Sequence, residues 1–456
     1  MSKLAVTSAA EGTFAALFEQ TATYQAAQPV WLQSLHTAAL SAFSTLGLPT
    51  RNDEEWRFTS PSRISETTYR LSDSVADSPD AATLAELVWE RLTDDTAPTG
   101  YVICNGRILS GVGGLIAPAA PAVTGRIADL ADDSQNPIAE KVRAALGSRI
   151  TLDQNGLAAL NSAFFEDGIY LYIPRSAVIE KPIELVFVSG SPAERGPDAL
   201  MNAPRLLIIA EENSQATILE TYISAFPGAF TCAVTEVIAG DNSVVDHYKV
   251  TDENADALHV AQMGVQLGTG TVFSSHSVTL GGGFVRNEVT ARLDGEHAEC
   301  TLNGLYLGDG DRLLDNHTTI DHASPNCSSH ELYKGILTDK SRGVFNGKIF
   351  VRLDAQKTDA KQTNKALLLS PDARVDTKPQ LEILADDVKC THGATIGQLE
   401  PNQVFYLRSR GISETDARSL LTYAFAGDVV QRIKVAALKS ALDKRILELL
   451  PGNVGQ

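Results

Sequence analysis

The stretch from Val344 to Gln398 reads VFNGKIFVRLDAQKTDAKQTNKALLLSPDARVDTKPQLEILADDVKCTHGATIGQ. It contains four short β-type runs that are separated by Asp, Asn, Gly and Pro, and no helical period passes through it. The runs are residues 348–353, 366–369, 380–384 and 387–392. The stretch therefore predicts successive short strands joined by turns.

Cys390-Thr391-His392 lies at the end of this stretch. Residues two apart on a strand point to the same side, so Cys390 and His392 share a face with Val388 and Ala394. Thiolate and imidazole bind soft metals, but tetrahedral sites of this kind take about four ligands, so the pattern predicts an incomplete metal half-site. Packing is the alternative, because free cysteine is commonly buried and a core histidine can bond a backbone carbonyl.

Short alternating strands with almost no helical pattern extend from Tyr101 to about Ile396. Turn clusters recur in this region about every 28 residues, a spacing in the range of solenoid repeats. Such a chain suits either a parallel β-helix or a long β-sandwich, and the regular spacing favours the β-helix. The clusters are Glu212-Asn213, Asp241-Asn242, Gly268-Gly270 and Asp294-Glu296.

Helical patterns flank the strand region. Residues 30–46 and 81–92 are amphipathic, and after Ser413, which begins a sequence like a capping box, residues 417–430 and 435–450 carry apolar faces. A C-terminal helical pair of this kind is typical of a cover over the open end of a solenoid, whereas an exposed apolar face would bind a partner.

The sequence thus predicts a mainly β protein with helical ends. An N-terminal helical domain is expected at residues 1–100, a parallel β-helix core at 101–399 and a C-terminal helical domain at 400–456. Between the first two helical patterns lies PTRNDEEWRFT (residues 49–59), whose acidic residues 52–55 suit a solvated N-cap and first turn.

Composition excludes several classes of protein. The 456 residues carry a formal net charge of −18, which disfavours binding to nucleic acid or to an anionic membrane surface. No apolar run approaches the roughly 20 residues of a membrane-spanning helix. The N-terminus has neither a signal-peptide pattern nor an Arg-rich transit pattern, so we expect a cytoplasmic protein.

The five cysteines are scattered without a C-x-x-C pair, so neither a disulfide framework nor a self-contained zinc or iron–sulfur site is expected. Phosphate-binding and hydrolase motifs are also absent from the sequence, so any ATP must be handled by another chain. The histidines of the strand region are expected to occupy ordinary polar sites, with His317 and His322 on opposite faces. These histidines are His276, His297, His317, His322 and His330.

Three segments carry a resemblance to a known family. They read KTDAKQTNKALLLSPDARVDTKPQLEILADDVKCTHGATIGQLEPNQVFYLRSRGISETDARSLLTYAFAGDVV (residues 357–430), YKGILTDKSRGVFNGKIFV (333–351) and PTRNDEEWRFT (49–59). These segments resemble the SufD side of the SufB/SufD family, which belongs to the SUF iron–sulfur cluster assembly system. The match is close from Tyr333 to Val430 and looser over most of the remaining chain.

The resemblance implies N- and C-terminal helical domains around a right-handed parallel β-helix. It also implies a non-catalytic scaffold subunit that joins SufB and two copies of the SufC ATPase, and assembles nascent clusters at the interface with SufB. No cofactor is then expected on the chain alone, only a transient iron–sulfur cluster shared with SufB. A homodimer of the isolated chain and a flavin in the complex are left open.

The resemblance also assigns residues. His392 matches the histidine regarded as a ligand or transfer residue for the nascent cluster, and Cys390 lies beside it. SufB carries cysteines where this chain has Thr363 and Ala373, which identifies the SufD-like subunit. The segment on which SufC docks corresponds to Arg410, Arg418, Leu420, Leu421, Tyr423 and Phe425.

Two other functional classes remain. A β-helix is also the fold of polysaccharide lyases and hydrolases, but those enzymes are usually secreted and this chain lacks a signal-peptide pattern. Alternatively, the chain is a purely structural partner of SufB, in which His392 only packs. The position of His392 distinguishes these two roles: a ligand would lie at a subunit interface, whereas a residue that only packs would lie deep inside the solenoid.

Overall fold

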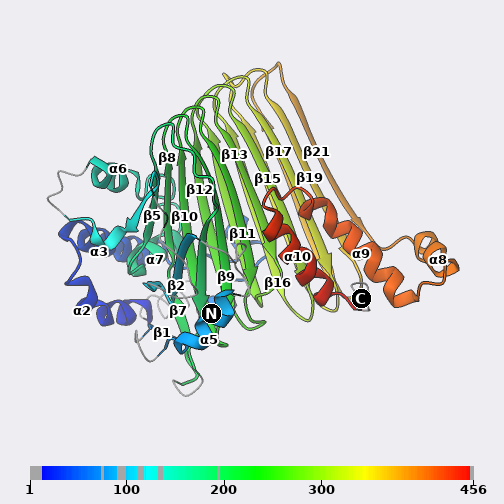
Figure 1. Ribbon diagram of the computed structural model, residues 1–456, viewed down its shortest axis with the longest axis horizontal. Helices are drawn as coiled ribbons and strands as arrows, with labels where there is room; N and C mark the ends of the chain where they lie inside the picture. The colour runs from blue at the N-terminus through cyan, green and yellow to red at the C-terminus, as the bar shows by residue number, and fades with distance from the viewer. Residues whose placement is uncertain are drawn as a thin grey trace.

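Two long parallel β-sheets run side by side as a solenoid (Figure 1). The computed structural model of the protein describes residues 13–72, 77–89, 99–109, 118, 120–131, 137–192 and 196–451. From β8 onward, successive strands alternate between the sheets, and each strand pairs in parallel with the strand two places along the chain. The β-helix prediction is confirmed, because a β-sandwich would need antiparallel sheets.

The elements have the following bounds. Sheet A contains β1 (Tyr69–Arg70), β4 (Val123–Arg126), β5 (Ile169–Ile173), β7 (Ala199–Asn202), β8 (Arg205–Ala210), β10 (Ala229–Ala239), β12 (Leu258–Leu267), β14 (Phe284–Leu293), β16 (Leu313–His322), β18 (Arg342–Val351) and β20 (Arg374–Ile383). Sheet B contains β2 (Thr99–Cys104), β3 (Arg107–Leu109), β6 (Ile183–Ser189), β9 (Gln215–Ser224), β11 (Val244–Asp252), β13 (Val272–Thr279), β15 (Glu299–Gly308), β17 (Ser328–Leu337), β19 (Asp359–Leu368) and β21 (Lys389–Gly397). The helices are α2 (Ala22–Gln25), α3 (Val30–Leu46), η1 (Glu54–Trp56), α4 (Ser62–Ser65), α5 (Ala81–Trp89), η2 (Ile127–Asp129), α6 (Pro137–Ala145), α7 (Gly156–Phe164), α8 (Pro401–Ser409), α9 (Glu414–Val430) and α10 (Ala436–Leu449).

The recurring turn clusters are the corners of successive coils. Asn213, Asn242, Gly270 and His297 all have positive φ, between 56° and 64°, a conformation that Asn and Gly tolerate best. Their backbone N–H groups donate to the next coil: Asn213 to the carbonyl of Asp241 at 2.9 Å and Asn242 to that of Thr269 at 2.7 Å. The spacing seen in the sequence is therefore the repeat of the solenoid.

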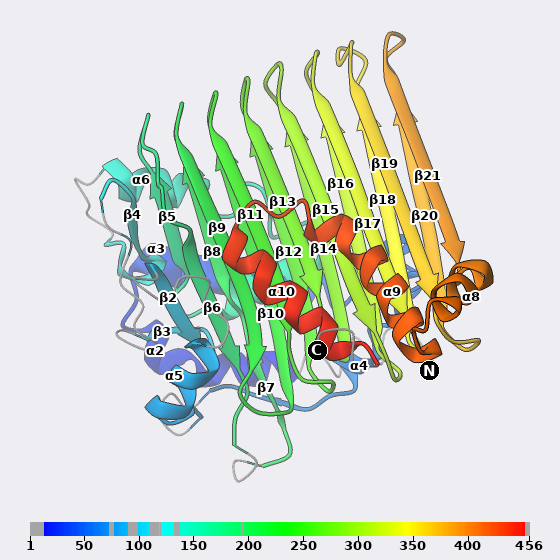
Figure 2. The ribbon, with the colours of Figure 1, turned by 45° about the vertical axis from the view of Figure 1, so that its right-hand side comes forward.

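Helices cover the outer faces of both sheets (Figure 2). On sheet A, α3 and α7 bury residues such as Leu32, Phe43 and Leu160 against the first coils. On sheet B, α9 and α10 pack Val429 and Ile446 over outward-facing residues of β11 to β17. The expected cover over the open end is thus wrong, because the apolar stripe that these helices bury lies on the outer face of sheet B. Helices α6 and α7 also fall inside residues 101–399, so regular coils begin only after Phe164.

The segment around Trp56 is fastened to the outer face of sheet A. Arg286 of β14 is fully buried, with its guanidinium 4.1 Å from the Trp56 ring centroid and 2.5 Å from an Asp315 oxygen. Glu55 accepts hydrogen bonds from Asn346 at 2.9 Å and lies 3.2 Å from Nδ1 of His317. The acidic run therefore forms a clamp onto the sheet, and only the single turn η1 is helical where a longer helix start was expected.

The charged groups of this clamp shift one another's pKa values. Burial opposes ionisation of Asp315, yet Arg286 and His317 lower its pKa to about 2. Burial likewise disfavours charged His317, but the Asp315 carboxylate, 3.0 Å away, raises its pKa above the usual value. His322, on the other face of β16, bonds Ser329 inside the solenoid at 2.9 Å, so the opposite orientation of the two histidines is confirmed.

Replacement of Arg286 should destabilise the protein strongly. Arg286→Met leaves the buried Asp315 carboxylate without its guanidinium partner, and breaking such a pair costs about 3–5 kcal/mol. Arg175→Ala removes the exposed pair with Glu212 and should cost less than about 1 kcal/mol. Thermal and denaturant unfolding of both variants checks this, and equal losses would contradict a buried clamp.

The contribution of the clamp to the free energy of unfolding should also depend on pH. Because folding raises the pKa of His317, its contribution is present below the ordinary histidine pKa and is lost as pH rises through the folded value. The difference in unfolding free energy between the wild type and His317→Gln should therefore shrink as pH rises above the ordinary histidine pKa of about 6.5. A difference that grows over this range would show that His317 is neutral in the folded protein.

Candidate functional site

The last coil of the solenoid, formed by β20 and β21, is an open end. In the described part of the chain, β20 is the terminal strand of sheet A and β21 that of sheet B, so each keeps one edge without a paired strand. Large apolar side chains are exposed on this coil, with Ile383 at 39%, Leu384 at 56% and Ile396 at 52%. An exposed edge with apolar neighbours is a surface that proteins normally cover.

Cys390 and His392 lie on β21 at this end. The parallel register aligns Cys390 with Ala360 and His392 with Gln362, and both β19 residues are buried inside the solenoid. The shared face predicted from the sequence therefore points into the interior. Cys390 is half-buried and packs against the interior apolar cluster, whereas His392 is exposed because no further coil lies over it.

Cys390 and His392 offer a sulfur and a nitrogen as donor atoms. Burial raises the pKa of the Cys390 thiol, so it stays protonated until a metal displaces the proton. Among the described residues, His, Cys, Asp and Glu do not gather in groups of three that could hold a metal ion. His392 has no side-chain hydrogen bond or ion pair within that part of the chain. This end can thus supply two ligands at most, and both are reachable from outside.

The two positions at which the resemblance implies cysteines in SufB, Thr363 and Ala373, lie apart from this pair. Thr363 pairs with Gly393 and points to the other face of β19, away from Gln362. Ala373 lies in the turn before β20 and packs with Tyr306 and Leu337. Among the other histidines of the strand region, His276 stacks on Tyr248 and His297 occupies a coil corner. His330 lies two coils beneath Thr391, on the outward face of β17.

The residues assigned to the docking segment divide into two groups. Arg410 and Arg418 are exposed, and Leu420 is 36% exposed. Tyr423 and Phe425 instead pack within the helix–sheet cluster, where the Lys334 ammonium lies 4.4 Å from the Phe425 ring centroid. Leu421 is half-buried. Only the first group is available to another protein without unfolding of the helices.

Helix α8 lies within the C-terminal helical domain expected at residues 400–456, although no separate run was singled out there, and it extends the available surface. It follows β21 directly and stands beside the open end (Figures 1 and 2), with no buried residue. Phe405 and Tyr406 are 71% and 57% exposed. Pro401 at the first helical position was the available signal, because proline is favoured there. Two adjacent exposed aromatic residues are unusual on a surface that stays in water.

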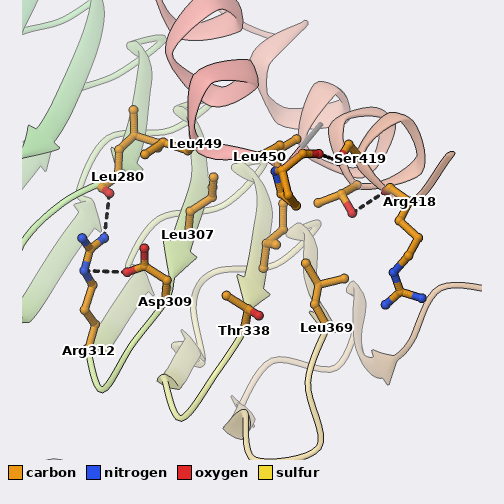
Figure 3. Close-up of a pocket in the computed structure, with 14 residues that line it drawn as sticks. Leu280, Leu307, Asp309, Arg312, Thr338, Leu369, Arg418, Ser419, Leu449 and Leu450 are labelled. Carbon is orange, nitrogen blue, oxygen red and sulfur yellow. Dashed lines mark hydrogen bonds and ion pairs between the residues drawn. The ribbon is translucent and has the colours of Figure 1, made fainter. Parts of the chain in front are cut away.

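A pocket of about 230 Å³ separates α9 and α10 from the corners of sheet B (Figure 3). Leucines such as Leu307 and Leu369 form its walls, and Arg312 is held at one side by Asp309 and the carbonyl of Leu280, at 2.9 and 3.1 Å. Arg418 lies at the other side. The C-terminal helices are therefore less tightly packed at this rim than along Val429 and Ile446.

No described helix is both long enough and apolar enough to cross a membrane. The five cysteines are all free, and Cys390 is the one that is not fully buried.

Comparison with known proteins agrees with this architecture. Residues 193–425 match the model of the SUF system FeS cluster assembly, SufBD core domain, and residues 8–185 match that of the SufBD protein N-terminal region. A SufBD family protein of Synechocystis sp. is 30% identical over 89% of this chain and 88% of its own length. SufD of Escherichia coli is 40% identical over 53% of this chain and 57% of its own, and SufD of Bacillus subtilis is 30% identical over 64% and 66%.

The two family models together span both the helical N-terminal region and the solenoid, and the relatives are named as iron–sulfur cluster assembly proteins. The chain belongs to the SufB/SufD family of the SUF iron–sulfur cluster assembly system.

Proposed function

We propose that this protein is a non-catalytic scaffold subunit on which a nascent iron–sulfur cluster is assembled at an interface with SufB. The observation that carries the proposal is the position of His392. It is exposed on the inward face of the last, uncovered strand, beside half-buried Cys390 and an apolar rim. Among the described residues its imidazole has no side-chain hydrogen bond or ion pair, so it is available to a ligand that a partner brings.

The open end supports a partner of the same architecture. A second β-helix that stacks its own last coil here would pair the free edges of β20 and β21 and bury Ile383, Leu384 and Ile396. A SufB chain meets that need as a paralogue. Another copy of this chain would meet it in part, so we expect the isolated protein to form a homodimer through the same end.

The metal chemistry also calls for a partner. Iron in clusters is held by thiolates and in some centres by histidine, and within the described residues Cys390 and His392 belong to no group of three potential ligands. The cluster is cargo, and the other ligands would come from SufB. Because burial raises the pKa of Cys390, its proton must leave as iron binds. His392 binds through a neutral nitrogen.

SufC would dock on α8 and the first half of α9. This surface presents Phe405, Tyr406 and Leu420 together with the cation of Arg410, which lies 5.3 Å from the Tyr406 ring centroid. Because α8 follows β21 without a further element, a movement of α8 driven by the ATPase would reach the strand that carries His392. ATP hydrolysis itself belongs to SufC.

A purely structural role beside SufB is the second candidate. Half-burial of Cys390 against the interior cluster favours packing for that residue. The exposure of His392 does not, so substitution of His392 separates the two roles.

Substitutions of His392 should change cluster yield in a defined order. His392→Ala should lower the yield of the SufB–SufC–SufD complex by more than the roughly tenfold cost of losing an outer-shell partner. His392→Cys should retain part of the yield, because thiolate also binds iron, and His392→Leu should retain none. Anaerobic cluster spectroscopy on complexes of equal stability measures these yields.

Thr391→Ala is the matched control, because Thr391 is equally exposed but faces the other side of β21. It should leave the yield unchanged. A Leu variant with normal yield would leave His392 as a packing residue and would favour the structural role.

Charges on α8 should prevent SufC binding. The double variant Phe405→Asp and Tyr406→Asp replaces two exposed aromatic residues, each a candidate for about 2 kcal/mol of binding energy, so capture of SufC should fall at least tenfold. The fold should be unaffected, because α8 buries no residue.

Ala437→Asp with Ser440→Asp adds the same charge to exposed positions of α10 and should leave capture unchanged. Circular dichroism checks that all variants are folded. If the α8 variant captures SufC normally, the docking surface does not include Phe405 and Tyr406.

A further inference from the structure

A column of polar side chains lies directly beneath His392. Parallel register places His392 over Gln362 of β19, and Gln362 over Glu331 of β17. Gln362 and Glu331 are 1% and 4% exposed, in an interior that is otherwise mostly apolar. Burial of polar groups costs free energy unless they are hydrogen-bonded. The presence of two polar side chains at these interior positions therefore requires an explanation.

The chain leaves room for the Gln362 amide. Its Nε2 donates to Oε2 of Glu331 at 2.6 Å. Across the interior, on β18, a Cβ added to Gly347 would lie 2.2 Å from the same Nε2. Any side chain at position 347 would therefore displace the amide. Gly347, in FNGK, and Gln362, in KQTN, belong to two of the segments that carry the family resemblance. Gly347 thus provides the space that the Gln362 amide occupies.

The orientation of the amide follows from its partner. Because Nε2 is the atom that donates to Glu331, Oε1 is the end of the amide that is turned away from that carboxylate. Oε1 of Gln362 is buried and has no hydrogen-bond partner among the described residues. The side chain that the register places over this free acceptor is His392, whose own ring nitrogens are also unbonded in that part of the chain.

We propose that Gln362 is the positioning residue for His392, whose imidazole N–H its Oε1 accepts when a partner covers the open end and iron binds. The inference rests on the proposed role of His392 as a ligand. With one ring nitrogen bonded to Gln362, the tautomer is set and the other nitrogen is free for the metal. Glu331 holds the amide in the orientation that presents oxygen, and Gly347 provides the space.

The test is a titration of the complex with SufB and SufC by Fe²⁺ alone, under anaerobic conditions. Gln362→Met keeps the length of the side chain but removes the acceptor, and it should weaken Fe²⁺ binding 10- to 100-fold. The exchanged pair Gln362→Glu with Glu331→Gln keeps an acceptor oxygen at position 362 and an amide donor at position 331, and it should retain at least the wild-type affinity. Gly347→Ala should act like Gln362→Met, because it displaces the amide.

Asn364→Val is the matched control. Asn364 is a buried amide on the same face of β19 that bonds the carbonyl of Tyr333, but it lies beneath Ala394. Its loss should leave Fe²⁺ affinity unchanged at a similar loss of melting temperature. If the unpaired Glu331 carboxylate stops Gln362→Met from folding, the pair Gln362→Met with Glu331→Gln replaces it.

A double-mutant cycle separates the positioning role of Gln362 from the ligand role of His392. In a His392→Ala background, Gln362→Met should have no further effect on Fe²⁺ affinity, because Gln362 acts only through His392. An effect that persists in this background, or no effect in the wild type, overturns the positioning role. An unchanged affinity in His392→Ala itself overturns the ligand role of His392 instead.

Discussion

Parallel pairing between successive coils is the constraint on which the rest of the structure depends. No coil can satisfy its own backbone N–H and C=O groups, so each must bond to the coil before and the coil after it. This stacking decides which side chains lie over one another, and it brings His392 above Gln362. This pairing could continue with any further coil that is added. The last coil keeps unpaired edges on β20 and β21, and the site lies where the pairing ends.

The two ends of the chain are used elsewhere, which is why this coil stays open. Apolar outward residues on the first coils of sheet A attract the N-terminal helices, and those on the middle of sheet B attract α9 and α10. The clamp of Trp56 over Arg286 extends the N-terminal cover across sheet A as far as Glu54, which pairs with Lys378 of β20 at 2.7 Å. The helices thus cover the outer faces of the earlier coils, while β20 and β21 remain partly or fully exposed to a partner.

The interior near that end is chemically distinct from a plain hydrophobic core. Burial raises the pKa of Glu331 to about 7, which is the cost of keeping a carboxyl group two coils beneath the surface. A leucine at that position would pack without this cost. The polar column is therefore better explained by what it holds in place than by any contribution to stability, and it ends at the residue exposed to the partner.

Much of the architecture could be predicted from the sequence, because it depends on interactions between residues that are close together in the chain. The turn clusters marked the coils because left-handed corners favour Asn and Gly, helix α3 has the predicted bounds, and the Ser413 hydroxyl caps α9 by accepting from the N–H of Asp416 at 3.1 Å. The common face of Cys390 and His392 follows from the two-residue period of a strand. The sequence alone determined these features, since each depends on neighbours within a few residues. Only the tertiary structure decided that the C-terminal helices lie on sheet B, that Trp56 covers Arg286 and that Gln362 lies beneath His392, because these contacts join residues 30 to more than 200 positions apart, whose pairing depends on the coil register and not on any local pattern.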